Sequence, residues 1–428
     1  MFIREDLEMA TAVMWFRRDL RLADNPALLD AVAAGDGSVV GLFVLDPLLW
    51  DQSGGPRREH LAGSLRSLSE SLGGRLVVRR GDPVEVVRAL AAEVDAVSVH
   101  ISADYGPYGR RRDAAVEKAL RCPLVSTGSP YAVAPGRVLT QQGSSYRVFT
   151  PYFHAWLEHG WRQPVDAPPD IEWVDAKGDR LPSSKVVAGE GAARDQWEAY
   201  LDEVAEYGEV RDRPDLDATS RMSVPLKYGE IHPRTMLADL ARRRSAGAEG
   251  YRRELAWREF CADLLAGHPD AAWKPLRPEF DKMEYDEPGD AFDAWCRGMT
   301  GYPIVDAGMR ELASTGFMHN RVRMVVASFL VKDLHVHWKF GARWFMQNLV
   351  DGDLASNSLN WQWVAGCGAD ASPYFRVFNP STQAKKFDPD GEYQRRWIPE
   401  LGTPDYPEPI VDHAEARLEA LRRYDAIR

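Results

Sequence analysis

Three side chains that could bind a ligand share one face of a predicted helix. Asn320, Arg323 and Met324 lie in the run MHNRVRM, inside an apolar helical pattern, and their spacing of three and four residues places them together. A guanidinium needs a partner before it leaves water, so Arg323 requires a carboxylate. Asp351 and Asp353 are the candidate partners. This spacing predicts a polar cluster built from two segments of the chain.

Two tryptophans follow these carboxylates. Trp361 and Trp363 are two residues apart, so on a helix they point about 200° away from each other. One indole can face a pocket while the other faces elsewhere, although two packed core tryptophans are the simpler interpretation of the pair alone. Asn357 extends the polar set. Polar groups among dense aromatic residues indicate a pocket for a large, flat ligand with polar edges.

Two further clusters lie earlier in the chain. Hydroxyl groups at 219–223 precede a helical pattern, where a phosphate would be stabilised by the helix N-terminus, although the same pattern alone more often caps a helix. Glu254, Trp257 and Arg258 have the spacing of one helix face. The simpler interpretation of that face is a surface salt bridge beside a packed tryptophan.

The elements that position these residues fall into two kinds. Short apolar runs alternate with helical patterns in the first third of the chain, which predicts an α/β fold with a parallel, Rossmann-like sheet. The expected strands are 12–16, 39–45, 76–78, 96–101 and 124–125, and the expected helices are 26–34, 59–72, 83–92 and 110–120. No GxGxxG follows the first strand, so a dinucleotide fingerprint is missing. Ligands of such sheets bind beyond the carboxyl ends of the strands.

The remainder of the chain reads as a connector and a helical domain. Residues 128–192 are rich in Pro and Gly, with an aromatic island at 149–156 that we expect to pack against a domain. From about 196 the spacing is helical. The predicted division is an α/β domain at 11–128, a linker at 129–195 and an all-α domain at 196–428.

Bulk properties limit the possible functions. A chain of 428 residues exceeds one compact core, and its net charge of −11 argues against general affinity for nucleic acid but allows a local basic groove. The four cysteines form no CxxC pair, which indicates reduced thiols and neither a disulfide framework nor a metal site. The charged start at 1–6 is unlike a signal peptide, and no apolar run approaches the ~20 residues of a membrane span. We expect a cytoplasmic protein without membrane contact.

Several long motifs resemble the photolyase/cryptochrome family, specifically the class I cyclobutane pyrimidine dimer (CPD) DNA photolyases. The resemblance starts at MWFRRDLRL from Met14 and extends over nearly the whole chain. The other matching runs are GYPIVDA from Gly301, FMHNRVRM from Phe317, DGDLA from Asp351, WQW from Trp361 and PYFRVFNPSTQ from Pro373. The resemblance implies light-driven repair of CPDs by electron transfer from excited FADH⁻ to a dimer flipped out of the DNA, in a monomer acting on single- or double-stranded DNA.

The resemblance also implies which residues bind FAD. The implied contacts with the diphosphate, ribose and flavin are Tyr207, Thr219, Ser220, Arg221, Met222, Ser223, Tyr251, Asn320, Arg323, Asp351, Gly352, Asp353 and Asn357. Asn357 would face flavin N5, and Arg323 paired with Asp351 would hold the polar edge of the flavin. The usual Ser-Pro of the hydroxyl motif is Val224-Pro225 here, a mild departure.

The damaged bases and the DNA backbone have their own implied contacts. Glu254 and Asn320 would hydrogen-bond the dimer, and Met324 would pack against it. Trp257 and Trp363 would wall the pocket on opposite sides, which suits a base extruded from the duplex. The remaining implied contacts to DNA are Arg211, Arg258, Arg321, Arg376, Gln383 and Lys386. A solvated surface charge is the alternative for each cation taken singly.

Reduction of resting flavin in this family runs along three tryptophans. Trp361 and Trp338 match the proximal and middle positions, whereas Tyr285 stands at the distal position. Either Tyr285 is the terminal donor or another exposed aromatic residue replaces it. Other departures lie near the flavin, at Ser358-Leu-Asn360, Cys367 and Ala369.

The antenna loop is DYGPYGRRRD from Asp104. It resembles members that bind 8-hydroxy-5-deazaflavin more than members that bind folate, which carry Asn-Glu where Tyr108 and Gly109 stand. The implied contacts are Arg18, Asp46, Asp104 and Arg112. An empty or vestigial site is the alternative.

Three other functions compete with CPD repair. A cryptochrome-type photoreceptor without repair activity would not require the full set of dimer contacts present here. A (6-4) photolyase would be expected to carry histidines where Asn320 and Met324 stand. A two-domain FAD protein for dark electron transfer would need a nicotinamide fingerprint or a redox partner.

Overall fold

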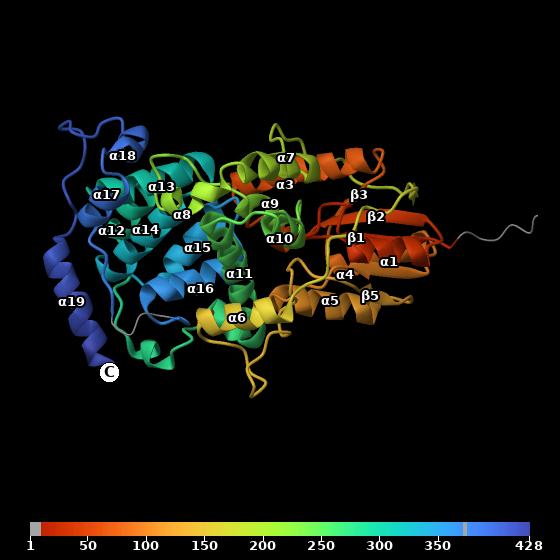
Figure 1. Ribbon diagram of the computed structural model, residues 1–428, viewed down its shortest axis with the longest axis horizontal. Helices are drawn as coiled ribbons and strands as arrows, with labels where there is room; N and C mark the ends of the chain where they lie inside the picture. Colours follow the sequence, from red (N-terminus) through yellow and green to blue (C-terminus); the bar gives the residue numbers. More distant parts are fainter. Residues whose placement is uncertain (1–9, 371–374) are drawn as a thin grey trace, which may run out of the picture.

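A parallel sheet lies at one end of the protein and a helical assembly at the other (Figure 1). The computed structural model describes residues 10–370 and 375–428. The charged start at 1–6 lies outside the described residues, as do Pro373 and Tyr374, the first residues of the last matching run.

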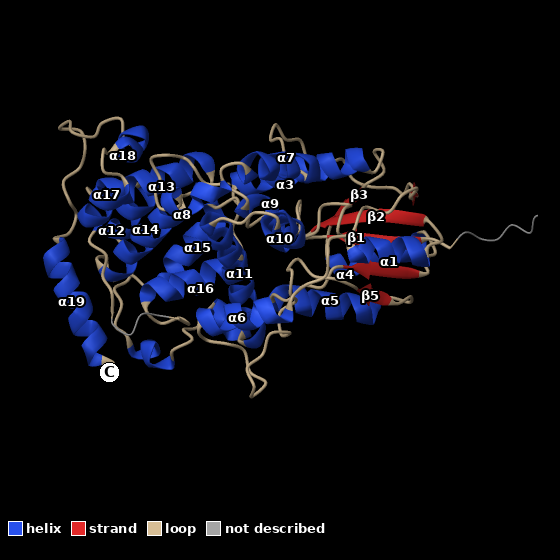
Figure 2. Ribbon diagram, in the orientation of Figure 1, coloured by secondary structure: helices blue, strands red, loops and turns tan. Residues whose placement is uncertain are grey.

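The sheet confirms the predicted α/β fold (Figure 2). Its strands are β1 (Ala12–Phe16), β2 (Ser38–Leu45), β3 (Val77–Arg80), β4 (Ser98–Ile101), β5 (Leu124–Ser126) and β6 (Glu172–Trp173). They pair in parallel in the order β3-β2-β1-β4-β5, with β6 added to β2. The connecting helices are α1 (Pro26–Ala34), α2 (Pro47–Trp50), α3 (Gly55–Ser71), α4 (Pro83–Glu93) and α5 (Pro107–Ala119).

Alternate side chains of β1 enter two different cores. Met14 and Phe16 pack with residues of α1 and α3, whereas Val13 and Trp15 pack with residues of α4 and α5. Because successive side chains of a strand point to opposite faces, both faces of the sheet are buried. This explains why the first strand reads as a continuous apolar run.

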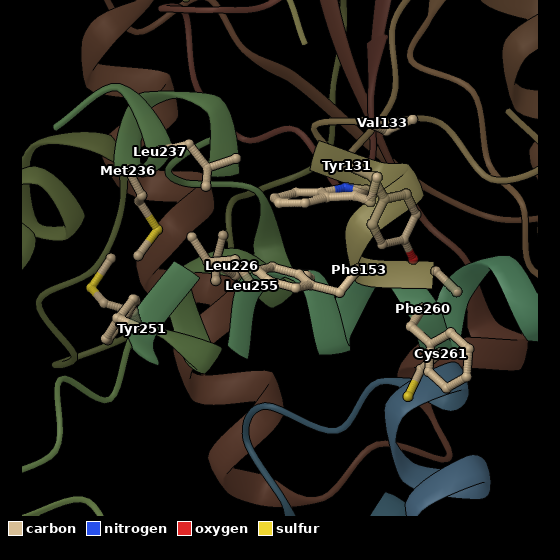
Figure 3. Close-up of a cluster of buried hydrophobic side chains, with 14 of the residues drawn as sticks. Tyr131, Val133, Phe153, Leu226, Met236, Leu237, Tyr251, Leu255, Phe260 and Cys261 are labelled. Atoms are coloured by element: carbon tan, nitrogen blue, oxygen red, sulfur yellow. The ribbon is translucent and has the colours of Figure 1, made fainter. Parts of the chain in front are cut away.

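The stretch predicted as a linker contains two whole elements and the start of α7 (Glu190–Leu201). The aromatic island forms α6 (Phe149–His159), and its aromatic side chains are buried in one cluster with the helical region, as expected. Figure 3 shows Phe153 of α6 in this cluster with Tyr131, Leu226, Leu255 and Phe260. The strand β6 was not predicted, because two residues are too short for an alternating pattern. The division at 128/129 and 195/196 stays a prediction.

The helical region surrounds α16, which packs against α11, α14 and α15. Its helices are α7 (Glu190–Leu201), α8 (Tyr207–Val210), α9 (Ser223–Tyr228), α10 (Pro233–Ala241), α11 (Ala246–Gly267), α12 (Asp290–Arg297), α13 (Pro303–Thr315), α14 (Asn320–Lys332), α15 (Trp338–Asn348), α16 (Leu354–Ala365), α17 (Pro380–Phe387), α18 (Glu392–Trp397) and α19 (His413–Ala426). Throughout the described residues, no helix is long and apolar enough to cross a membrane.

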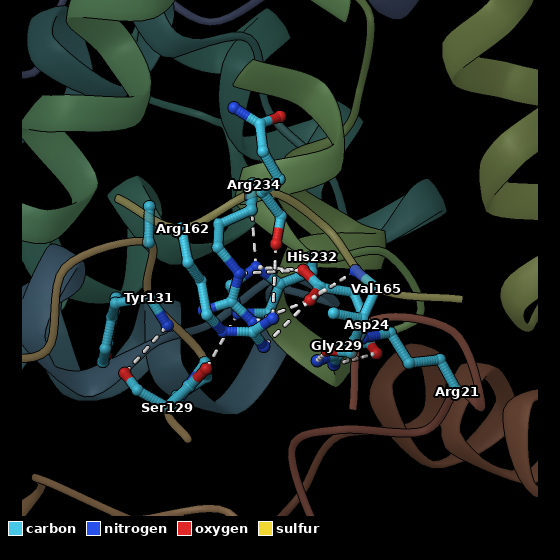
Figure 4. A network of polar contacts seen from close by, with 12 residues as sticks. Arg21, Asp24, Ser129, Tyr131, Arg162, Val165, Gly229, His232 and Arg234 are labelled. Carbon is cyan, nitrogen blue, oxygen red and sulfur yellow. Dashed lines mark hydrogen bonds and ion pairs between the residues drawn. The ribbon is translucent and has the colours of Figure 1, made fainter. Parts of the chain in front are cut away.

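A buried carboxylate ties the sheet region to the helical region (Figure 4). Asp24, between β1 and α1, accepts hydrogen bonds from Arg234 Nε at 2.9 Å and Nη2 at 3.0 Å, and from Arg162 Nη2 at 3.0 Å. Arg21 Nη2 donates to the Asp24 carbonyl oxygen at 2.8 Å. Since Arg234 lies on α10 and Arg162 lies between α6 and β6, this network fixes the sheet against the helices that carry the site.

Candidate functional site

The turn at 351–353 is the polar centre of the site. Asp351 is buried, and its Oδ2 accepts from Arg323 Nη2 at 2.9 Å and from Ser223 Oγ at 2.7 Å. Arg323 Nε also donates to the Met318 carbonyl at 2.7 Å. The predicted pairing of Arg323 with one of the two carboxylates is therefore present, and the first residue of α9 joins it.

The second carboxylate of this turn has a partner from the other end of the protein. Asp353 caps α16 by accepting from Ser356 N at 3.0 Å, and its Oδ2 lies 2.6 Å from Arg18 Nη2. Burial acts to raise the pKa of Asp353, but nearby cations, chiefly Arg18 and Lys227, outweigh it and hold that pKa well below its usual value. Asp353 is therefore ionised.

One buried acceptor in this turn lacks a partner. Within the described part of the chain, Oδ1 of Asp351 is buried and accepts no hydrogen bond. An unpaired buried acceptor costs about 1–3 kcal/mol, so the site fits a ligand that presents an N–H or O–H donor there. The polar edge of a flavin, the group implied by the resemblance, has such a donor.

Asn357 and Trp361 extend the site along α16. The Asn357 Nδ2 donates to the Ala342 carbonyl at 2.9 Å, which fixes the orientation of the amide. Trp361 is buried among Trp295, Phe345 and α15, whereas Trp363 is only half-buried. The two indoles therefore lie in different surroundings, as their spacing on a helix predicts.

The hydroxyl-rich segment lies against α11. Ser220 Oγ is 2.7 Å from Tyr251 Oη, and the Tyr251 ring packs edge-on against Tyr207 at 5.1 Å. Thr219 is half-buried, and Arg221 pairs with Asp217 at 2.6 Å.

Met222 differs from the other residues of this segment. Its side chain is buried in the hydrophobic cluster of α6 and α11, and its expected contact with FAD stays a prediction. The hydrophobic character of this residue decided its position.

Two consecutive residues, Arg211 and Asp212, connect residues predicted to contact the dimer and the DNA backbone. Arg211 pairs with Glu254 of α11 at 2.6 Å, and Asp212 binds Arg321 of α14 at 2.7 Å and 3.2 Å. Asn320, exposed beside Arg321, begins α14. The segment after α8 therefore brings the faces of α11 and α14 together.

Trp257 and Arg258 occupy different surroundings although they are neighbours. Trp257 stacks on Phe149 with ring centroids 3.8 Å apart and planes inclined by 8°, so one indole face is covered. Arg258 donates to the carbonyl oxygens of Pro130 and Leu226, each at 3.0 Å, and lies over Tyr131. This inward position differs from the expected contact with DNA, because the guanidinium satisfies buried carbonyl groups instead.

A cavity adjoins the half-buried Trp363. Its lining includes Trp363, Arg376, Arg277, Lys332 and Phe375, and Trp363 Nε1 donates to the Asp370 carbonyl at 3.0 Å. Two predicted DNA contacts, Trp363 and Arg376, therefore share one cavity.

Three other predicted contacts lie on α14 and α17. Met324 is half-buried and packs on the cluster around Trp361. Gln383 is half-buried and Lys386 exposed on α17, which packs against α13 and α14. No contact joins Gln383 or Lys386 to Glu254 among the described residues.

Two residues predicted for electron transfer, Tyr285 and Trp338, lie on either side of one unexpected ring. Tyr285 lies 4.5 Å from the His337 ring, and His337 lies 5.6 Å from Trp338, measured between ring centroids. Trp338 and Gly341 lie one turn apart on α15, and Gly341 contacts the Trp361 ring. His337 was not predicted, since its role depends only on its position between two rings.

We predict that Gly341→Ala destabilises the protein by about 1–3 kcal/mol, as overpacking does in cores. A Cβ at this position would come within 2.2 Å of the Trp361 ring and 2.6 Å of Leu330. Thermal unfolding measures the change. Gly191→Ala in α7 is the matched control, because a Cβ there meets nothing within 4 Å. Equal effects of the two substitutions would contradict the packing argument.

The predicted antenna residues are linked through shared neighbours. Asp104 and Arg112 pair at 3.3 Å, Arg112 lies over the Tyr108 ring, and the Tyr108 hydroxyl donates to Asp46. Arg18 pairs with the half-buried Asp353. Burial acts to raise the pKa of Asp104, but Arg18 and Arg112 together outweigh it and lower that pKa, so Arg18 joins this group to the turn at 351–353. Gly109 is required here, since a Cβ would come within 2.1 Å of Asp104.

Comparison with known proteins agrees with this architecture. Residues 12–170 match the family described as DNA photolyase, and residues 251–404 match the FAD binding domain of DNA photolyase. A deoxyribodipyrimidine photo-lyase of Agrobacterium fabrum is 40% identical, covering 99% of each chain.

Solved structures show the same similarity over the whole fold. The crystal structure of a bacterial class III photolyase from Agrobacterium tumefaciens superposes with a TM-score of 0.92 at 38% identity, covering 100% of this chain and 99% of the other. An archaeal photolyase from Sulfolobus tokodaii with two FAD molecules gives a TM-score of 0.85 at 30% identity, covering 97% of this chain and 100% of the other.

Fold and site together define a class: an α/β photolyase domain followed by a helical FAD-binding domain. The chain belongs to the photolyase/cryptochrome family.

Proposed function

We propose that this chain repairs cyclobutane pyrimidine dimers in DNA with light, using reduced FAD as its cofactor. The observation that carries the proposal is the turn at Asp351. This carboxylate, held by Arg323 and Ser223 with one oxygen left unpaired, lies within the region that matches the FAD binding domain of DNA photolyase. Its relatives bear the name deoxyribodipyrimidine photo-lyase.

Reduced FAD would supply the light-driven electron that opens the cyclobutane ring and is then returned, so no net oxidation occurs. The protein's residues hold and orient the reactants. Trp257 would stack on an extruded base with the indole face that Phe149 leaves free. Glu254, partly exposed and paired with Arg211, would accept hydrogen bonds from the dimer, and Asn320 would donate to it. Met324 and Trp363 would complete the pocket.

The decisive test is repair of an oligonucleotide with one defined thymine dimer by the reduced protein, in light and in darkness. A (6-4) lesion in the same sequence serves as the control substrate. We expect light-dependent restoration of thymines from the first lesion only. Absence of repair by protein that holds reduced FAD would contradict the proposal and favour a photoreceptor.

The finer assignments stay predictions. The motifs resemble class I members, while a structure titled class III photolyase matches the whole chain. For the antenna we propose 8-hydroxy-5-deazaflavin, which the Asp104–Arg112 pair supports. The measurement that checks it compares the affinity of the antenna site for this compound with its affinity for a second FAD molecule. Action on single- or double-stranded DNA, a monomeric state and a cytoplasmic location are likewise part of the proposal.

Tyr285 gives a prediction about flavin reduction. Tyr285→Phe should slow light-driven reduction of oxidised FAD at least about tenfold, equivalent to about 1.4 kcal/mol in the barrier. Burial raises the pKa of Tyr285, so the phenol is protonated and must lose that proton on oxidation, which phenylalanine cannot do. Transient absorption measures the rate.

Tyr285→Trp is the conservative control, expected to restore reduction. Repair by chemically reduced protein should be equal in all three forms, because repair does not use the path. Unchanged reduction in Tyr285→Phe would show that another aromatic residue is the terminal donor.

A further inference from the structure

The two tryptophans expected to wall the dimer pocket are connected by contacts that lie outside their own helices. Trp257 belongs to α11 and Trp363 to α16, and these two helices pack against each other. Each indole is only half-buried, so helix packing alone does not fix either ring. A pocket that holds a flat ligand between two indoles requires a defined separation and orientation of the rings.

One end of this connection is the segment that follows α16. Gly366 ends the helix with a φ of 86°, and a Cβ on Gly368 would come within 2.8 Å of the Trp363 backbone nitrogen. The two glycines therefore allow the chain to turn back tightly across the end of α16. This return brings Asp370 beside the indole, where its carbonyl oxygen accepts from Trp363 Nε1 at 3.0 Å. The Trp363 ring is thus fixed to Asp370.

Asp370 is held in turn by the start of α6. Its backbone N–H donates to the Arg147 carbonyl oxygen at 3.0 Å. Burial raises the pKa of the Asp370 carboxyl, and a hydrogen bond from the Phe149 backbone N–H opposes that shift. The neighbouring Ala369 packs on the hydrophobic cluster that contains Phe149. Backbone and side chain of Asp370 therefore both join the end of α16 to the segment 147–149.

Phe149 completes the connection to the second tryptophan. Its ring stacks on Trp257 with centroids 3.8 Å apart and planes inclined by 8°. The ring is buried, stacks on Phe153 at 5.7 Å and packs edge-on against Phe260 at 5.8 Å. Because other aromatic rings hold Phe149 in place, it forms a fixed backing for one face of the Trp257 indole.

We propose that Asp370 and Phe149 are positioning residues that set the separation of Trp257 and Trp363, and thereby the affinity of the pocket for a pyrimidine dimer relative to undamaged DNA. The inference rests on the proposed function and adds to it two residues that act through the tryptophans. An extruded dimer must fit between the two indoles, whereas undamaged DNA is bound mainly through its phosphates. A change in the separation of the rings should therefore alter the first affinity and leave the second unchanged.

The test is a pair of dissociation constants, measured in darkness with FAD-loaded protein, for an oligonucleotide with one thymine dimer and for the same oligonucleotide without it. Phe149→Leu removes the stacked ring, and Asp370→Gly permits the same positive φ but removes the carboxylate. We expect each to weaken binding of the dimer at least about fivefold, the low end for loss of a stacked base, with unchanged binding of undamaged DNA.

Two comparisons make this result specific. Asp370→Asn should keep the wild-type ratio of the two dissociation constants, because its amide oxygen can accept from the Phe149 N–H and asparagine tolerates the left-handed conformation. The double variant Phe149→Leu/Asp370→Gly should lose less than the product of the two single losses, because both substitutions interrupt one connection. Phe16→Leu is the matched control, since Phe16 is equally buried but lies in β1, and it should leave the ratio unchanged.

The outcomes separate the alternatives. An unchanged ratio in Phe149→Leu and Asp370→Gly, with or without a lower unfolding temperature, overturns the inference and assigns both residues a purely structural role. Losses that multiply in the double variant also overturn it, because they show two independent effects. If Phe149→Leu does not fold, the comparison of Asp370→Gly with Asp370→Asn decides. Wild-type protein that binds both oligonucleotides equally contradicts the proposed function itself, which is distinguishable because no variant is involved.

Discussion

Asp351→Ala is expected to weaken FAD binding at least about tenfold, because a hydrogen bond to a charged group contributes about 1.5–3 kcal/mol and each 1.4 kcal/mol is a factor of ten. The substitution leaves the Arg323 guanidinium and the Ser223 hydroxyl without their shared acceptor. It also removes the orphaned Oδ1 that fits a ligand donor. Flavin fluorescence during titration of the apoprotein measures the dissociation constant.

Two further variants make this result specific. Asp351→Asn keeps the shape of the side chain and one acceptor but removes the charge, so we expect an intermediate loss of FAD affinity. This variant replaces Asp351→Ala in the test if the alanine form does not fold. Asp405→Asn changes an exposed carboxylate far along the chain and should bind FAD normally. Equal affinity of the Asp351 and Asp405 variants would contradict the assignment of the turn at 351–353 as the flavin site.

Asp24→Asn is expected to lower the free energy of unfolding by about 3–5 kcal/mol. Asp24 is buried, and its carboxylate accepts from Arg234 and Arg162. His232 is also within 3.2 Å, but burial and the nearby Arg21 hold the pKa of His232 well below its usual value, so its imidazole is neutral. The arginines are therefore the groups that an amide would leave uncompensated. Urea unfolding followed by circular dichroism measures the loss.

Asp36→Asn is a closely matched control for this substitution. Asp24 and Asp36 both have a positive φ, 49° and 48°, and asparagine tolerates this left-handed conformation as aspartate does. Asp36 is exposed, so its replacement should leave the unfolding free energy within about 0.5 kcal/mol of wild type. A similar loss in both variants would show that backbone conformation, not the buried network, accounts for the effect.

The interdomain contacts change the interpretation of two sequence motifs. Arg18 was expected at the antenna and also pairs with Asp353, while Arg258 was expected at DNA and instead holds the carbonyl of Pro130. In each case an acceptor on a distant segment determines the direction of the guanidinium. Spacing along the chain carries no information about such an acceptor.

Regular, local patterns could be recognised from the sequence alone. The strand at 12–16 and the helix at 26–34 were predicted with their observed bounds, because an apolar run followed by a Pro-initiated helix depends only on neighbouring residues. A carboxylate partner for Arg323, either Asp351 or Asp353, was also predictable, since a guanidinium on an apolar helix face requires one, and the resemblance alone singled out Asp351. Tyr285 was singled out only through the resemblance to photolyases.

Tertiary structure alone decided which distant groups complete the site. Arg18 lies 335 residues from Asp353 and pairs with it, and Arg57 packs on Gly352, although no periodicity links these positions. Electrostatic interactions depend on the distance between two charges and on how deeply each charge is buried. For groups on remote segments, both quantities are fixed only when the chain has folded. The sequence therefore determined the elements and the need of Arg323 for a carboxylate, and the fold determined which distant groups meet at the turn.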